Sequence, residues 1–65
     1  MKSTIDLMVQ HVMKVEYAYD IHMDTWVVRA TALQNQTSVV ECSQTKAKLA
    51  KATQICVRRL AEALT

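Results

Sequence analysis

Apolar residues between positions 5 and 33 recur at the spacing of an α-helix. At 100° per residue they fall within about 80° of one direction over about eight turns. This stripe is typical of one long amphipathic helix, which we predict over residues 4–33. Ser3 or Thr4 would cap its start, with Asp6 favourably placed in the first turn. The residues of the stripe are Ile5, Met8, Val9, Val12, Val15, Tyr19, Met23, Trp26, Val27, Ala30 and Leu33.

A polar segment at residues 34–37 interrupts this pattern and predicts a short loop. Ser38 and Glu41 follow at the spacing of a capping box, which indicates a second helix over residues 38–64. Lys46 interrupts the apolar face of this helix and is expected to extend outward along its stem. The apolar face comprises Val39, Cys42, Leu49, Thr53, Cys56, Val57, Leu60 and Leu64.

The predicted fold is all-α, a single domain formed by an antiparallel two-helix hairpin. The composition favours it, because the 65 residues include no glycine and no proline, which sharp turns usually require. One alternative remains for the Val- and Thr-rich segment 25–42, in which residues 26–28 and 38–40 would form two strands around a turn at 34–36. That turn would lack glycine, and an isolated hairpin is only marginally stable, so the helices are preferred.

The first predicted helix carries a second apolar stripe on its back, more than a hairpin can bury. Covering that stripe requires either a second copy, giving a four-helix-bundle homodimer, or another protein. The function expected from this surplus is that of a non-enzymatic, chaperone-like adaptor or inhibitor that works by protein binding. The residues predicted to make the contact are Leu7, Tyr17, Ile21, Val28 and, on the second helix, Ile55.

Charge suggests an alternative function, nucleic-acid binding by a small dimeric regulator. The net charge is only +2, but residues 34–65 carry five basic and two acidic side chains. Clustered cations can follow a phosphate backbone. The candidate contacts, which share one face of the second predicted helix, are Lys48, Lys51, Arg58 and Arg59.

No catalytic, metal or cofactor motif is present, so we expect a protein that is not an enzyme and binds no cofactor. His11 and His22 would lie about 16 Å apart along one helix, too far to share a metal ion. Cys42 and Cys56 could not pair within one helix, and we predict free thiols in a reducing compartment, the cytoplasm. Residues 1–6 include Asp6 where a signal peptide would be apolar, and no apolar run is long enough to cross a bilayer.

Overall fold

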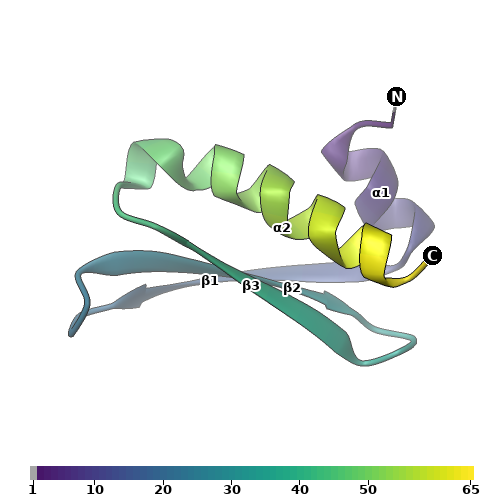
Figure 1. The fold of residues 1–65 in the computed structure, drawn as a ribbon, viewed down its shortest axis with the longest axis horizontal. Coiled ribbons are helices and arrows are strands. Elements are labelled where there is room, and N and C mark those ends of the chain that lie inside the picture. Colours follow the sequence, from purple (N-terminus) through teal and green to yellow (C-terminus); the bar gives the residue numbers. More distant parts are fainter. Residues whose placement is uncertain (1) are drawn as a thin grey trace.

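The protein is a small α+β fold, in which two helices cover one face of a three-stranded antiparallel sheet (Figure 1). The computed structural model describes residues 2–65. Met1, the first residue of the segment 1–6 in which no signal peptide is expected, lies outside the described residues. In chain order the elements are α1 (Thr4–Gln10), β1 (Met13–Asp20), β2 (Thr25–Ala32), β3 (Thr37–Ser43), the 3₁₀ turn η1 (Lys46–Lys48) and α2 (Leu49–Ala63). The prediction of an all-α hairpin is therefore wrong.

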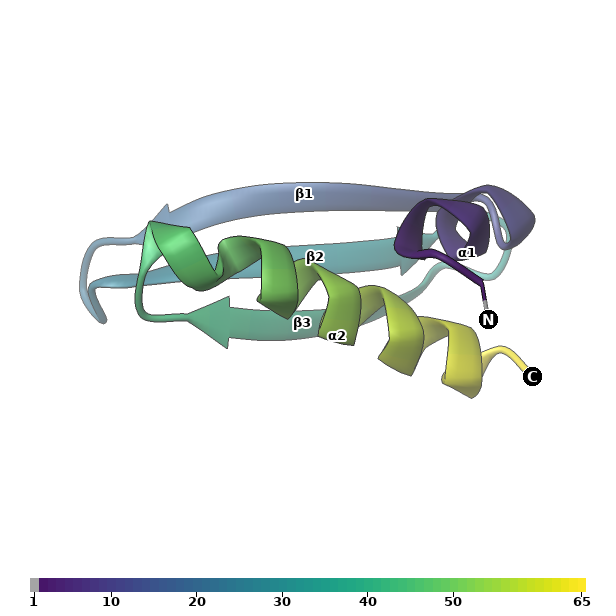
Figure 2. The same ribbon diagram turned by 90° about the horizontal axis from the view of Figure 1, so that it is seen from above.

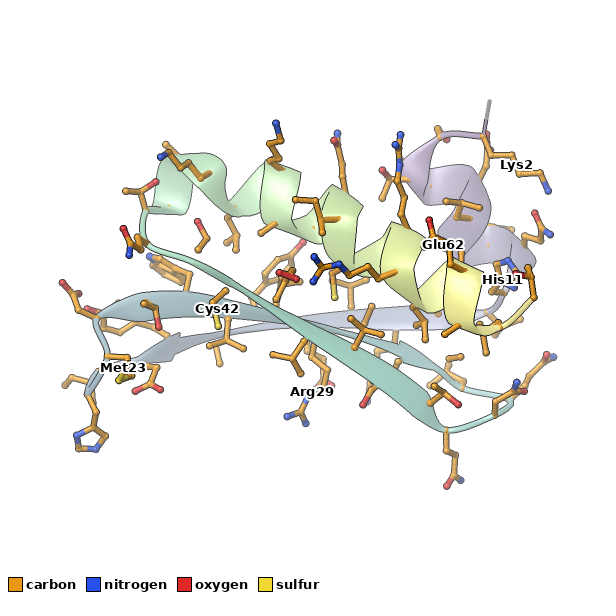
Figure 3. The ribbon with its side chains drawn as sticks, in the orientation of Figure 1. Lys2, His11, Met23, Arg29, Cys42 and Glu62 are labelled. Carbon is orange, nitrogen blue, oxygen red and sulfur yellow. The ribbon has the colours of Figure 1, made fainter. Side chains whose placement is uncertain are left out.

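The three strands form a simple meander of order β1-β2-β3. Tyr17 pairs with Val28, and Val28 pairs in turn with Glu41, so these side chains lie on the same face of the sheet. The helices cover this face, and Figure 2 shows α1 above β1 and β2 at one end while α2 crosses the sheet diagonally. The opposite face is open to solvent, and Arg29 extends from it away from the helices (Figure 3).

The core lies between β2, β3 and the inner side of α2. Val28, Cys56, Val57 and Leu60 are fully buried, and each comes from a position that the strand or helix repeat directs inward. Leu7 and Met8 of α1, Val15 of β1 and Val39 of β3 pack around this centre. The last turns of the predicted second helix and its apolar residues from Leu49 onward are confirmed, because α2 buries this face.

The long first helix is wrong beyond Gln10. α1 begins as predicted, since the Ser3 hydroxyl accepts a hydrogen bond from the Asp6 backbone N–H at 3.1 Å and the Asp6 carboxylate accepts one from the Ser3 N–H at 3.2 Å. The helix then ends at His11, and Val12 adopts a left-handed conformation with φ of 52°. The turns before β2 and β3 contain two further left-handed residues, Asp24 with φ of 51° and Gln36 with φ of 55°. Such residues allow sharp turns without glycine.

The start of the second helix is also corrected. Ser38 and Glu41, expected to form a capping box, lie within β3 instead. The segment becomes helical only after Thr45, whose hydroxyl accepts a hydrogen bond from the Lys48 N–H. The alternative of two strands around residues 34–36 is confirmed, since β2 and β3 pair from Trp26↔Ser43 to Ala32↔Thr37. Helical-hairpin and four-helix-bundle descriptions therefore do not apply. Within residues 2–65, no helix is long and apolar enough to cross a membrane.

Candidate nucleic-acid interface at the start of α2

A compact group of lysines marks the N-terminal end of α2. We call Lys46, Lys48 and Lys51 the lysine cluster; all three are exposed. Thr45 positions them, because its hydroxyl caps η1 and so fixes where the helical backbone begins. At helical rises of 1.5–2 Å per residue the cluster spans only about 8–10 Å along the axis. Three lysines therefore lie within a short length of the helix axis at its N-terminal end.

This placement opposes the preference of the helix itself. The N-terminal end of a helix carries a partial positive charge, so cations there are unfavourable by roughly 0.3–1 kcal/mol each and acids are favourable. Neither η1 nor the first turn of α2 contains an acidic residue, and Glu62 lies near the opposite end, where a cation would be favoured. The helix dipole and the lysine cluster therefore both make the N-terminal end of α2 positive, and an external anion bound there would be stabilising.

No acidic side chain neutralises the lysine cluster. Ion pairs form elsewhere, between Lys14 and Glu16 and between Arg59 and Glu41, whereas among residues 2–65 none of the three lysines has a side-chain hydrogen bond or ion pair. Their charges are therefore free to meet a ligand. The structure thus retains Lys48 and Lys51 from the predicted basic face and adds Lys46.

Arg59 and Arg58 occupy different surroundings from the lysines. The Arg59 guanidinium lies 2.6 Å from a carboxylate oxygen of Glu41, which clamps α2 to β3. Glu41 has a side chain only 21% exposed, so this pair is a structural contact rather than a free cation. Arg58 lines a hollow with His11 of α1 and Ala61 of α2, two turns beyond Lys51. Arg59 is thus paired, whereas Arg58, seven residues from Lys51, lies on the same side of α2 as that lysine.

The aromatic side chains are paired with each other and flanked by acids. The rings of Tyr19 and Trp26 lie 5.3 Å apart, and the Tyr19 hydroxyl donates a hydrogen bond to the Asp24 carboxylate. This hydrogen bond raises the pKa of Tyr19. The Asp20 carboxylate accepts backbone hydrogen bonds from His22 and Met23 in the same turn, at 3.0 and 3.3 Å. Two carboxylates beside the ring pair disfavour phosphate binding there.

A groove of about 510 Å³ adjoins the lysine cluster, between the end of β3 and the first half of α2. Ala52 and Ile55 supply its apolar part, Lys48 and Lys51 its charged part, and residues 41–44 the opposite wall. The Ser43 hydroxyl donates a hydrogen bond of 2.7 Å to the Thr45 carbonyl, which closes the connection from β3 to η1. This groove was not foreseen, because it forms only when a strand and a helix come together.

The residues predicted to bind a partner are dispersed. Val28 is fully buried in the core, and Leu7 packs against it from α1. Tyr17 lies beside Val28 and donates a hydrogen bond of 2.9 Å to Thr53 of α2, whose own hydroxyl donates to the Leu49 carbonyl. Ile21 is 77% exposed in the β1–β2 turn, and Ile55 lies on the outside of α2. The second stripe disappears together with the long helix that defined it.

The cysteines differ in their environments. Cys42 is exposed on β3, whereas Cys56 is buried, and both thiols are free. The Cys56 thiol lies 3.0 Å from the Val39 carbonyl oxygen, and burial raises its pKa. Over residues 2–65 no three histidine, cysteine or acidic side chains are grouped so that they could hold a metal ion.

Lys46 is the residue that sequence reasoning placed incorrectly. It extends outward as expected, but it is the first residue of η1 and does not interrupt the apolar face of a long helix. Its position directly after Thr45, a good capping residue, was the signal that could have located the true helix start. No protein-family model matches the chain, and comparison with curated proteins and with solved structures gives no significant match.

Proposed function

We propose that this protein binds the phosphate backbone of duplex nucleic acid through the lysine cluster, and that double-stranded RNA is the ligand that fits best. The observation that carries the proposal is the concentration of three unpaired lysines at the positive end of α2, against the preference of the helix dipole. Charges placed against the preference of the helix dipole are typical of a functional site. A phosphate would relieve the repulsion and satisfy the free charges at once.

The surroundings favour a duplex over a single strand. Single strands are normally bound by stacking their bases on aromatic rings next to cations. Here Tyr19 and Trp26 pack on one another beside Asp24, and the lysine cluster contains no aromatic residue. Binding would therefore depend on the regular spacing of phosphates, which a duplex provides without any base contact.

The shape of the site favours RNA. α2 crosses the sheet diagonally (Figure 2), and beyond the lysine cluster its exposed cations are interspersed with Ile55 and Glu62, and Arg59 is paired with Glu41, so the N-terminal end suits phosphates best. The major groove of an RNA duplex is deep and narrow, which brings the phosphates of both strands close to one compact group of cations. Readout of DNA would instead require side chains that reach base edges in a wide groove. Backbone recognition of this kind is independent of sequence.

The test is binding of labelled ligands measured by fluorescence anisotropy at low salt. We expect a 20-base-pair RNA duplex to bind more tightly than a DNA duplex of the same sequence, and single-stranded RNA to bind least. Replacing Lys46, Lys48 and Lys51 together by Ala should abolish duplex binding. The control is Lys14→Ala, which removes a cation from β1 on the open face of the sheet. Equal binding by the wild-type and triple-variant proteins would refute the proposal.

The proposed compartment is the cytoplasm. An exposed thiol such as Cys42 persists in a reducing environment, where disulfides are rare. Duplex binding, with no enzymatic step, is the activity proposed there. Fractionation of cells that express a tagged protein tests the compartment.

A further inference from the structure

We infer that the groove between β3 and α2 binds an extended acidic peptide, which adds to the sheet as a fourth strand beside β3. This inference does not rest on the proposed duplex binding, but the two ligands would compete, because both would contact Lys48 and Lys51. Strand addition combines main-chain hydrogen bonds along an exposed edge with pockets for alternate side chains. Both features are present at this edge of the molecule.

The outer edge of β3 is open and poorly protected. The sheet order ends at β3, so one side of this strand pairs with β2 and the other with no strand among residues 2–65. Proteins usually protect such edges with proline, lysine, bulges or a covering element. β3 has the sequence TSVVECS, with no proline and no basic residue, and its one charge, Glu41, turns inward to Arg59. The other edge strand, β1, carries Lys14, Glu16 and Asp20 on its open face.

The groove beside this edge has the dimensions and lining of a side-chain site. Its volume is about 510 Å³, Ala52 and Ile55 supply apolar lining, and an added strand would direct alternate residues toward α2. Ile55 is 37% exposed, which leaves area for a ligand to cover. Main-chain pairing would supply affinity, and contact with Ile55 would fix the register.

The charges of the groove select an acidic ligand. Lys48 and Lys51 line it without a partner, whereas the carboxylate of Glu41 is already neutralised by Arg59. The groove is therefore positive. Acidic side chains at every second position of an added strand would face α2 about 7 Å apart, within reach of both lysines. A basic peptide would meet repulsion in the same place, so charge gives the site its specificity.

The test uses a fluorescein-labelled octapeptide of alternating valine and glutamate. Its control is the octapeptide of alternating valine and lysine, which has the same strand propensity and opposite charge. We expect the acidic peptide to bind at least about tenfold more tightly by anisotropy. Hydrogen exchange should slow at backbone amides in residues 37–43, because an added strand pairs with the free edge. Equal affinity for both peptides, or unchanged exchange along β3, would overturn the inference.

Two variants separate this site from the duplex site. Ile55→Gln removes the apolar surface on which the methylene groups of the glutamates would pack and should weaken the acidic peptide about fivefold while duplex binding is unchanged. Lys46→Ala should weaken the duplex and leave the peptide unaffected, because Lys46 does not line the groove. Circular dichroism checks that both variants fold. If Ile55→Gln leaves peptide affinity unchanged, or if light scattering shows a dimer that this variant dissociates and no peptide binding, the acidic-peptide site is refuted.

Discussion

The salt dependence of duplex binding follows directly from the number of free cations in the lysine cluster. Each phosphate that a lysine neutralises releases a counterion and contributes about −0.9 to the slope of log affinity against log salt concentration. Three contacts by Lys46, Lys48 and Lys51 give a slope of about −2.7. Raising the salt concentration from 50 to 200 mM, a fourfold change, should then lower the affinity about 40-fold.

Single substitutions make this prediction sharper. Lys51→Ala should reduce the slope to about −1.8, so that the same salt increase lowers affinity only about 12-fold. Lys14→Ala removes the same amount of charge but lies on the open face, paired with Glu16, and should leave the slope unchanged. Anisotropy titrations of an RNA duplex at four salt concentrations measure all three slopes. Equal reductions for Lys51→Ala and Lys14→Ala would mean that net charge, and not the cluster, attracts the duplex.

Four further predictions concern the fold. Leu60→Ala empties space in a fully buried site and should cost about 2–5 kcal/mol, close to the whole stability of a domain this small, so urea or thermal melts should show a largely unfolded protein at room temperature. Iodoacetamide should modify Cys42 in the native protein and Cys56 only after unfolding, as mass spectrometry can show. Because burial raises the pKa of Cys56, the thiol of the unfolded protein ionises at lower pH than that of the folded protein. The folding stability should therefore fall as the pH rises through the ordinary thiol range and be unaffected by this group below it. A melt series on Cys56→Ala, which should lack this pH dependence, provides the comparison. Ser3→Ala removes the cap of α1 and should destabilise it by about 1 kcal/mol, measured as faster amide exchange in residues 4–10; unchanged exchange would argue against the cap.

Local sequence signals predicted the start of α1 and the inward face of α2 correctly, but they predicted helix where the three strands form. The cap at Ser3 and the inward face of α2 depend on near neighbours, so both could be predicted. The error lies in β1, where apolar residues alternate with Lys14, Glu16 and Asp20 at the period of a strand. A helical stripe about 160° wide accepts nearly half of all positions, so an alternating strand can also satisfy it. Requiring a narrower apolar stripe for a helix would have favoured strands in this segment.

The candidate site was only partly predictable for a different reason. The sequence shows that Lys48 and Lys51 are basic, but it does not show that they lack an acidic partner. The nearby acid, Glu41, forms its ion pair with Arg59, which lies 18 positions further along the sequence. The sequence pattern instead predicts both residues on one helix, with Glu41 in its capping box and Arg59 on its basic face. The groove beside Ile55 likewise requires β3 and α2 to be adjacent, a non-local contact that no periodicity encodes.

The left-handed residues at the three turns lower the folding stability of this protein below what glycine at the same positions would allow. Left-handed backbone costs a non-glycine residue roughly 1–2 kcal/mol, most for a β-branched side chain such as Val12 and least for Asp24. The turns are separate, so these penalties should be nearly additive. A fold of this size can thus lose an appreciable share of its stability at turns that a single glycine would relax. Val12, which is β-branched and has φ of 52°, is therefore the position where substitution by glycine should stabilise the fold most.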